Sequence, residues 1–289
     1  MKTKKTGIAV LSAVIVIIAV IIAVCSPAVR TGFGNLGVNG LTGKDIQNSD
    51  SIVLLAHSAE IGGIANSSAG VKESVRLGAS GVCVDLCFRT DGTPVITDCY
   101  DNVDSAPTVE ELFKEMSAEK YKDIKLYLNI VQLSDMSELN RLAVEYNMIS
   151  RLSLIGIDTA HYGMITTDDT IIPFYLTYDV TFDDSSAVDD GTFIVPQAIS
   201  DYGASGIVID RSDCSEKIMN AFADYGVPVI VTGISSGNQL CSALLNGAQT
   251  VYVNNIQNSA KIFSGWISNM QERFESSVAQ SLKELSTTE

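Results

Sequence analysis

The chain has 289 residues, enough for one large domain or two small ones, and nearly half of them are hydrophobic, so it can bury a sizeable core. Its formal net charge of −15 argues against nucleic acid as a partner, because phosphate binding needs a cationic surface. The acidity is instead typical of a surface that stays soluble and repels anionic lipid.

The N-terminus has the layout of a membrane segment. Residues 1–5 carry three lysines, and the run from Ile8 to Val24 is apolar apart from Ser12, close to the roughly 20 residues that span a bilayer. Because lysines flanking a span stay in the cytoplasm, we expect a cytoplasmic tail (1–5), a transmembrane signal anchor (6–25) and an exported remainder. A cleaved signal peptide shares this layout, and secretion is the alternative that it implies.

The exported part is strongly acidic and carries an odd number of cysteines. Removing Lys2, Lys4 and Lys5 from the formal charge of −15 leaves −18 on it. Five of the six cysteines lie beyond the apolar run, where disulfides can form, so at least one thiol is unpaired. Residues 26–49 are rich in Gly, Asn and Thr without a sustained period, which predicts a linker between membrane and domain.

Short apolar strands alternate with helical stretches after the linker. This alternation predicts a parallel sheet closed into a (β/α)₈ barrel over residues 50–270. An open doubly wound sheet also alternates in this way, but no Gly-rich phosphate loop follows the first strand. The expected strands are 52–56, 82–88, 124–131, 152–157, 171–175, 206–209, 228–231 and 250–253, with an extra hairpin strand at 94–97. The expected helices are 69–77, 108–116, 135–146, 212–225 and 236–245.

A further helix is expected at the C-terminus. Its apolar side chains recur every three or four residues, which predicts one face that packs on the barrel. Residues 271–289 should form the end of this helix and a tail. The apolar positions are Phe263, Trp266, Ile267, Met270, Phe274 and Val278.

The second strand carries a carboxylate inside an apolar run. Residues 82–88 are apolar except for Asp85, and the Asp-Gly pair at 91–92 is a hairpin signal. Side chains alternate along a strand, so Cys83, Asp85 and Cys87 share the face that looks into the barrel. An ionised Asp there costs several kcal/mol unless it is paired, hydrogen-bonded or bound to a cation.

These motifs resemble the signature of the glycerophosphodiester phosphodiesterase family. The family signature runs His-Arg-Gly, Glu-Asn-Thr, a helix ending in Gly-Ala, then Glu-x-Asp, Asp-Gly and His-Asp. The resemblance covers roughly residues 52–255 and implies a TIM-like barrel of the PLC-like phosphodiesterase type that hydrolyses phosphodiesters. Here the same frame reads Ala56-His57-Ser58-Ala59, Ala65-Asn66-Ser67, Leu77-Gly78-Ala79, Cys83-Val84-Asp85, Asp91-Gly92 and Thr97-Asp98.

The resemblance implies a role for each matching position. In the family, two histidines act as general acid and base, three carboxylates hold a divalent cation, and an arginine binds the phosphate. His57 matches the first histidine, and Asp85 matches one of the metal ligands. Asp98 keeps the Asp of the His-Asp pair, and Asn66 keeps the Asn of Glu-Asn-Thr.

Several positions depart from the family pattern. Thr97 replaces the second histidine and cannot act as acid or base near neutral pH, and Ser58 replaces the arginine. Cys83 and Val131 replace the other two metal carboxylates, with Gln132 as the alternative if the alignment slips by one residue. We therefore expect Ca²⁺ or Mg²⁺ to bind weakly or not at all.

Other side chains offer replacements for the lost groups. His161 follows the fourth barrel strand and can reach the barrel mouth, and Arg89 offers a phosphate contact. A soft-metal site with Cys83 and Cys87 is disfavoured, because residues i and i+4 on a strand lie roughly 13 Å apart. A disulfide between Cys87 and Cys99 across the hairpin is the stronger expectation, and Cys83 is expected to be a buried thiol.

The sequence thus predicts a membrane-anchored extracellular domain of the glycerophosphodiester phosphodiesterase type. We expect it to be catalytically impaired, a pseudoenzyme or a ligand-binding module. The alternative is an active metal-dependent phosphodiesterase with rearranged catalytic residues. The expected ligands are a glycerophosphodiester, a lipid head group or a sugar phosphate.

Overall fold

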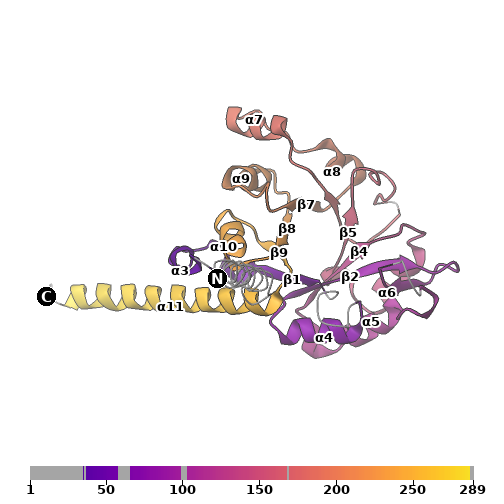
Figure 1. The fold of residues 1–289 in the computed structure, drawn as a ribbon, viewed down its shortest axis with the longest axis horizontal. Coiled ribbons are helices and arrows are strands. Elements are labelled where there is room, and N and C mark those ends of the chain that lie inside the picture. Colours follow the sequence, from indigo (N-terminus) through magenta and orange to yellow (C-terminus); the bar gives the residue numbers. More distant parts are fainter. Residues whose placement is uncertain (1–34, 36, 58–65, 99–102, 168, 287–289) are drawn as a thin grey trace, which may run out of the picture.

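The computed structural model describes residues 35, 37–57, 66–98, 103–167 and 169–286. Eight parallel strands close into a barrel in the order β1-β2-β4-β5-β6-β7-β8-β9, and pairing of β1 with both β2 and β9 completes the ring (Figure 1). β3 adds to the edge of β2 in antiparallel orientation, as the hairpin signal predicted. The predicted barrel is therefore confirmed.

The strands are β1 Val53–His57, β2 Gly81–Phe88, β3 Pro94–Ile96, β4 Lys125–Ile130, β5 Leu152–Ile157, β6 Phe174–Thr177, β7 Gly206–Asp210, β8 Val229–Ile234 and β9 Thr250–Val253. The helices are α3 Val38–Leu41, α4 Ser68–Arg76, α5 Val109–Met116, α6 Ser137–Glu145, α7 Phe182–Asp190, α8 Gln197–Tyr202, α9 Glu216–Asp224, α10 Gly237–Leu245 and α11 Ile256–Ser286.

Two apolar layers hold the barrel together. Between the strands and the helices, large side chains such as Phe113, Phe222 and Trp266 are fully buried. A separate cluster fills the barrel interior with one inward-facing side chain from each strand of the ring. Its members are Leu55, Cys83, Tyr127, Ile155, Val208 and Ile230, with the half-buried Tyr175 and Tyr252. Because this cluster blocks the interior, only the ends of the barrel can form a site.

The sixth strand differs from the prediction. Residues 171–175 were expected, but β6 begins at Phe174 and ends at Thr177. Pro173 has no N–H to donate to a neighbouring strand, although its carbonyl accepts from Leu154 N at 2.8 Å. Ile171 is therefore left outside the sheet and exposed.

The sequence patterns missed α7, which contains four aspartates and two serines and packs on the core through Ala187 and Val188. It begins with a capping box, in which Thr181 Oγ1 accepts from Asp184 N and the Asp184 carboxylate accepts from Thr181 N. Two adjacent apolar residues in a nine-residue helix do not form a repeating pattern, so periodicity does not reveal α7.

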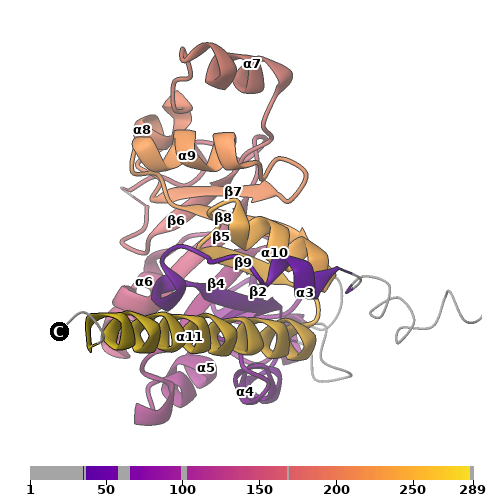
Figure 2. The same ribbon diagram turned by 90° about the vertical axis from the view of Figure 1, so that its left-hand side faces the viewer.

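Part of the predicted linker packs on the barrel. The carboxamide of Asn35 bonds to Asn258 and accepts from Gly237 N, and α3 lies beside α10 (Figure 2). Further on, the carbonyl of Lys44 accepts from Trp266 Nε1 at 2.7 Å. The segment that leads into β1 is thus tied to α10 and α11.

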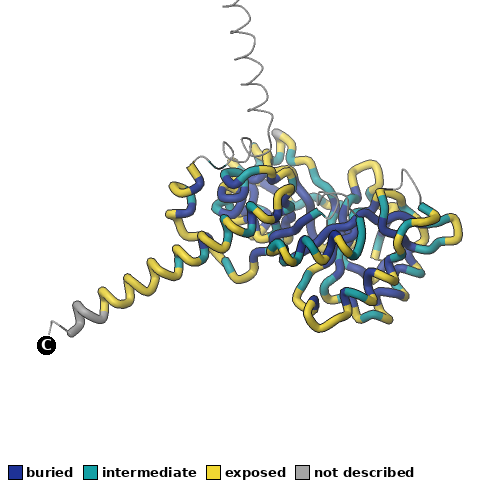
Figure 3. Tube along the Cα trace, turned by 60° about the horizontal axis from the view of Figure 1, so that its bottom comes forward, coloured by how far each residue is buried: buried dark blue, intermediate teal, exposed yellow. Residues whose placement is uncertain are grey.

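α11 runs for 31 residues, past the predicted domain boundary at residue 270. The first half of α11 packs on the barrel, and its second half extends beyond the globular part (Figures 1 and 3). Residues 271–281 in this second half are exposed. Within the described residues, no helix combines the length and apolar character of a membrane span. The expected transmembrane segment, residues 6–25, lies outside the described residues.

Candidate functional site

His57 and Asp85 meet at the C-terminal end of the barrel. His57 ends β1, which pairs in parallel with β2, and its Nε2 lies 3.3 Å from Asp85 Oδ1. The two side chains are 19% and 10% exposed, so both are largely shielded from solvent. This end of a parallel barrel carries the active sites of such folds, and the structure brings these two predicted residues together there.

Two asparagines complete the environment of Asp85. Asn66 Nδ2 donates to Asp85 Oδ2 at 2.9 Å, and Asn129 Nδ2 donates to Asp85 Oδ1 at 2.7 Å. The orientation of the Asn66 carboxamide is fixed, because its Oδ1 accepts from Asp85 N at 3.0 Å. Nitrogen donors from three different segments therefore converge on one carboxylate.

Asn129 was not among the predicted site residues. Asn129 lies directly opposite Asp85 in the parallel pairing of β2 and β4. A polar residue on the inward face of an apolar strand was the feature of the sequence that could have identified it as a site residue. Gly156 on β5 makes room for it. A Cβ at Gly156 would collide with Asn129 Oδ1, and the backbone there has a φ of +87°, which favours glycine.

Asp85 is an anion stabilised by its neighbours. Burial raises the pKa of this carboxyl, but the hydrogen bonds from His57, Asn129 and Asn66 lower it by more, so the net shift is downward. Asp85 therefore carries its charge at neutral pH, and protein donors compensate that charge.

Cys83 lies one layer below, inside the apolar interior cluster. Burial raises the pKa of its thiol far above the usual range, which a hydrogen bond with Tyr252 only partly opposes. The ring of Tyr252 also meets the ring of His57 edge-on, with 5.7 Å between centroids. Tyr252, a second residue that the sequence patterns missed, thus supports both side chains.

The remaining predicted residues lie at the edge of this cluster or turn away from it. Thr97 N donates to the Asp85 carbonyl at 3.0 Å, and Thr97 Oγ1 lies 3.4 Å from Asp98 Oδ1. Ser58 lies outside the described residues. The guanidinium of Arg89 donates to the carbonyls of Val103 and Ala106, so it ties down the loop before α5.

His161 is an exposed side chain in the loop that follows β5. Its Nδ1 pairs with Asp158 Oδ1 at 2.6 Å. In the described part of the chain, it makes no hydrogen bond to His57 or Asp85.

The structure tests the predictions for Cys83 and, in part, for Cys87. Cys87 is disulfide-bonded, and its predicted partner Cys99 lies outside the described residues. Cys83 is a free buried thiol, as predicted, and Cys214 and Cys241 are also free and buried.

Among the described residues, the donor set at Asp85 does not fit the divalent cation of the family. Ca²⁺ takes six to eight oxygen ligands and Mg²⁺ takes six. The side chain of Val131 has no donor atom, Gln132 is exposed, and the neutral thiol of Cys83 lies in the apolar interior. Among the residues that the structure describes, no three His, Cys, Asp or Glu side chains are placed to hold a metal.

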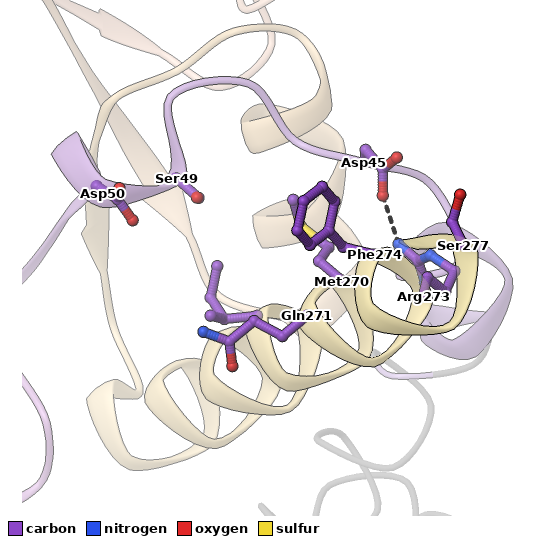
Figure 4. Close-up of a pocket in the computed structure, with 9 residues that line it drawn as sticks. Asp45, Ser49, Asp50, Met270, Gln271, Arg273, Phe274 and Ser277 are labelled. Atoms are coloured by element: carbon purple, nitrogen blue, oxygen red, sulfur yellow. Dashed lines mark hydrogen bonds and ion pairs between the residues drawn. The ribbon is translucent and has the colours of Figure 1, made fainter. Parts of the chain in front are cut away.

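A hollow lies beside α11 and shares no residue with the cluster around Asp85. Figure 4 shows it between the helix and residues 45–50, with Met270 and Phe274 toward the cavity and Arg273 pairing with Asp45 at 2.6 Å. Its volume is about 820 Å³.

Comparisons with known proteins find similarity to this barrel among solved structures. No family model and no curated protein matches the sequence. A putative glycerophosphoryl diester phosphodiesterase from Silicibacter pomeroyi has a similar structure, with a TM-score of 0.59 and 14% identity over 79% of this chain and 97% of that one. This chain has the fold of the glycerophosphodiester phosphodiesterases.

Two further solved structures support the same assignment. The glycerophosphodiester phosphodiesterase from Agrobacterium tumefaciens has a TM-score of 0.56 and 12% identity over 74% of this chain and 99% of that one. A putative enzyme from Galdieria sulphuraria has a TM-score of 0.56 and 13% identity over 74% and 98%. At such identities the likeness establishes the fold of this phosphodiesterase-like barrel, and the side chains at its mouth must decide the chemistry.

Proposed function

We propose that this phosphodiesterase-like barrel is a ligand-binding module that does not carry out metal-assisted phosphodiester hydrolysis. One observation carries the proposal. Asp85, which matches a metal ligand of the family, accepts hydrogen bonds from His57, Asn66 and Asn129, and among the described residues no three His, Cys, Asp or Glu side chains form a group that could hold a metal ion.

The chemistry of hydrolysis explains why this loss matters. A cation in such a site neutralises phosphoryl oxygens and lowers the barrier by several kcal/mol. The reaction also needs a base for the nucleophile and an acid for the leaving alkoxide, and loss of one such group costs about 10²–10⁴-fold in rate. His57 remains, but Thr97 stands in place of the second histidine.

Turnover of glycerophosphodiesters tests this proposal. The purified full-length chain should release no glycerol 3-phosphate above background from glycerophosphocholine or glycerophosphoethanolamine, with Ca²⁺, Mg²⁺, Mn²⁺ or Zn²⁺ present. Robust turnover that both His57→Ala and Asp85→Ala abolish would overturn it and favour an active enzyme with rearranged residues. Activity unchanged by both substitutions would identify a contaminant.

We also propose that the barrel is held at the cell membrane and faces the exterior. The lysines at residues 2, 4 and 5 and the apolar run that follows support this placement. Asn35 is hydrogen-bonded to Asn258 near the start of α11 and so belongs to the folded domain. About ten residues separate it from the end of the apolar run at Val24. The tether would therefore be short.

Protease treatment of intact cells tests the placement. Added protease should digest a C-terminally tagged chain that sediments with membranes. A tag that resists protease until the cells are lysed would contradict an exterior barrel, and a tag found in the medium would indicate a cleaved signal peptide.

A further inference from the structure

α11 carries an apolar stripe that continues past the globular part of the molecule (Figure 1). Ile267 and Met270 begin the stripe and pack partly on the core, whereas Phe274 and Val278 are 71% and 42% exposed. Leucines at positions 282 and 285 continue the same spacing in the sequence, and the helix itself extends to residue 286. At about 100° per residue, the six positions fall within about 120° of the helix surface. Phe274 and Val278 therefore face solvent in the single chain.

The same stripe forms one wall of the hollow in Figure 4. Ile267, Met270 and Phe274 line the hollow from the helix, and residues from the segment 45–50 line it from the opposite side. Its volume of about 820 Å³ is that of roughly two turns of a second helix, which is about 10 Å wide with its side chains. A groove beside an apolar stripe is the kind of surface that receives an amphipathic helix.

The spacing of the stripe indicates which helix fits it. The intervals between successive apolar positions are 3, 4, 4, 4 and 3 residues, so the pattern is the same in both directions. A second copy of α11 placed antiparallel, with the centre of the pair at residue 276, brings an apolar residue to the level of every apolar residue of the first. The pairs are Ile267 with Leu285, Met270 with Leu282, and Phe274 with Val278. Such self-complementarity is what a twofold dimer requires.

The charged residues of α11 favour the antiparallel pair over a parallel one. Between positions 267 and 285 they are Glu272, Arg273, Glu275, Lys283 and Glu284. In the antiparallel pair each lies at the level of an uncharged residue, respectively Gln280, Ala279, Ser277, Asn269 and Ser268. A parallel pair would instead place each charge at the level of its own copy, and like charges that meet at an interface weaken binding.

We propose that the chain forms a twofold dimer through α11. The C-terminal half of each helix lies antiparallel along the stripe of the other, and its end enters the hollow beside residues 45–50. The contact covers about 28 Å of helix and buries less than the standard area of about 800 Å² per partner, so a weak dimer with a Kd of roughly 10–100 μM is expected. Well below that concentration the chain is monomeric. The inference is independent of the proposed function, because the stripe shares no residue with the cluster around Asp85.

Sedimentation of the purified full-length chain in density-matched detergent tests the inference. We expect a monomer–dimer equilibrium, and Phe274→Lys should raise the Kd of the dimer at least about tenfold, because it places a charge in the apolar contact. Ser276→Lys is the matched control. It adds the same charge at an exposed position on the opposite face of the helix, so it should leave the Kd within about twofold.

A mixture of two variants tests the antiparallel register. Val278→Glu should weaken the dimer as Phe274→Lys does. Because position 274 of one copy lies beside position 278 of the other, the mixture of these two variants gains one Lys–Glu pair and keeps one Phe–Val pair. The mixed dimer should therefore be at least about fivefold tighter than the dimer of either variant alone.

Melting temperatures equal to that of the wild type show that the variants are folded. A folded wild type that stays monomeric up to about 200 μM would overturn the inference, and would show that detergent, lipid or solvent covers the stripe. A dimer that Phe274→Lys leaves unchanged would also overturn it, since contacts elsewhere, such as the apolar run at residues 8–24, would then join the copies. A mixed dimer no tighter than those of the single variants would contradict the antiparallel register.

Discussion

At Asp85, nitrogen donors from β1, from β4 and from Asn66, just before the N-cap of α4, converge on one buried carboxylate. A buried charge is tolerated only when it is compensated, and hydrogen bonds to a charged group contribute about 1.5–3 kcal/mol each. The carboxamides of Asn66 and Asn129 therefore contribute to the stability of the mouth.

Substitution of Asn129 should reveal this contribution. Asn129→Ala should lower the free energy of unfolding by about 1–3 kcal/mol, because Asp85 loses a charge-assisted bond without gaining access to water. Denaturant unfolding at pH 7 measures it. Asn254→Ala, an exposed asparagine at the same end of the barrel, is the control and should stay within about 0.5 kcal/mol.

The same variant should respond differently to acid. The pKa of Asp85 is lowered in the folded state, so its charge stabilises the fold above the ordinary value of 3.8, and that stability is lost as the pH falls through the lowered pKa. The difference between wild type and Asn129→Ala should therefore shrink below about pH 4. A constant difference between pH 7 and pH 3 would refute charge stabilisation by Asn129.

Sequence reasoning found part of this cluster. Asp85 was conspicuous as a charge in an apolar strand, and the family frame placed His57 and Asn66 beside it. Asn129 and Tyr252 were missed because their roles depend on which residues face each other across strands, and register is not visible in one strand alone. The alternation of β2 predicts that Arg89 points inward, but its guanidinium instead donates to backbone carbonyls of the loop after β3.

Among the elements, α11 and the segment before β1 depend on each other. Trp266 is fully buried and donates to the Lys44 carbonyl, and Arg273 pairs with Asp45 one to two turns later. The sequence predicted an apolar face of α11 that packs on the barrel, and this was right for Trp266 but wrong for Phe274 and Val278, which are exposed. The partner of this face was missed, because residues 26–49 show no period and were predicted to be a linker.

Removal of the Trp266 indole should destabilise the contact between α11 and the segment before β1. Trp266→Ala should cost about 3–5 kcal/mol in unfolding free energy, since it leaves a cavity and an unpaired carbonyl. Phe274→Ala, two turns along the same helix and 71% exposed, is the matched control and should change stability by less than about 0.5 kcal/mol. Equal effects of the two substitutions, measured by calorimetric melting, would contradict the packing described for α11.

For the whole molecule, the barrel was predictable because the strand-helix alternation repeats around the ring, so the errors at β6 and α7 left the topology unchanged. Chemistry was less predictable. The solved phosphodiesterase structures share only 12–14% identity with this chain, and a common fold does not determine the side chains at its site.

The central claim is that protein donors, rather than a divalent cation, compensate Asp85. Calorimetric titration of the EDTA-treated full-length chain with Ca²⁺ tests it most directly, with Asp85→Asn as the reference. We predict no saturable binding to the wild type tighter than about 1 mM, the weak end of protein calcium sites, and matching traces for both proteins. Binding tighter than about 0.1 mM by the wild type that Asp85→Asn abolishes would contradict the account.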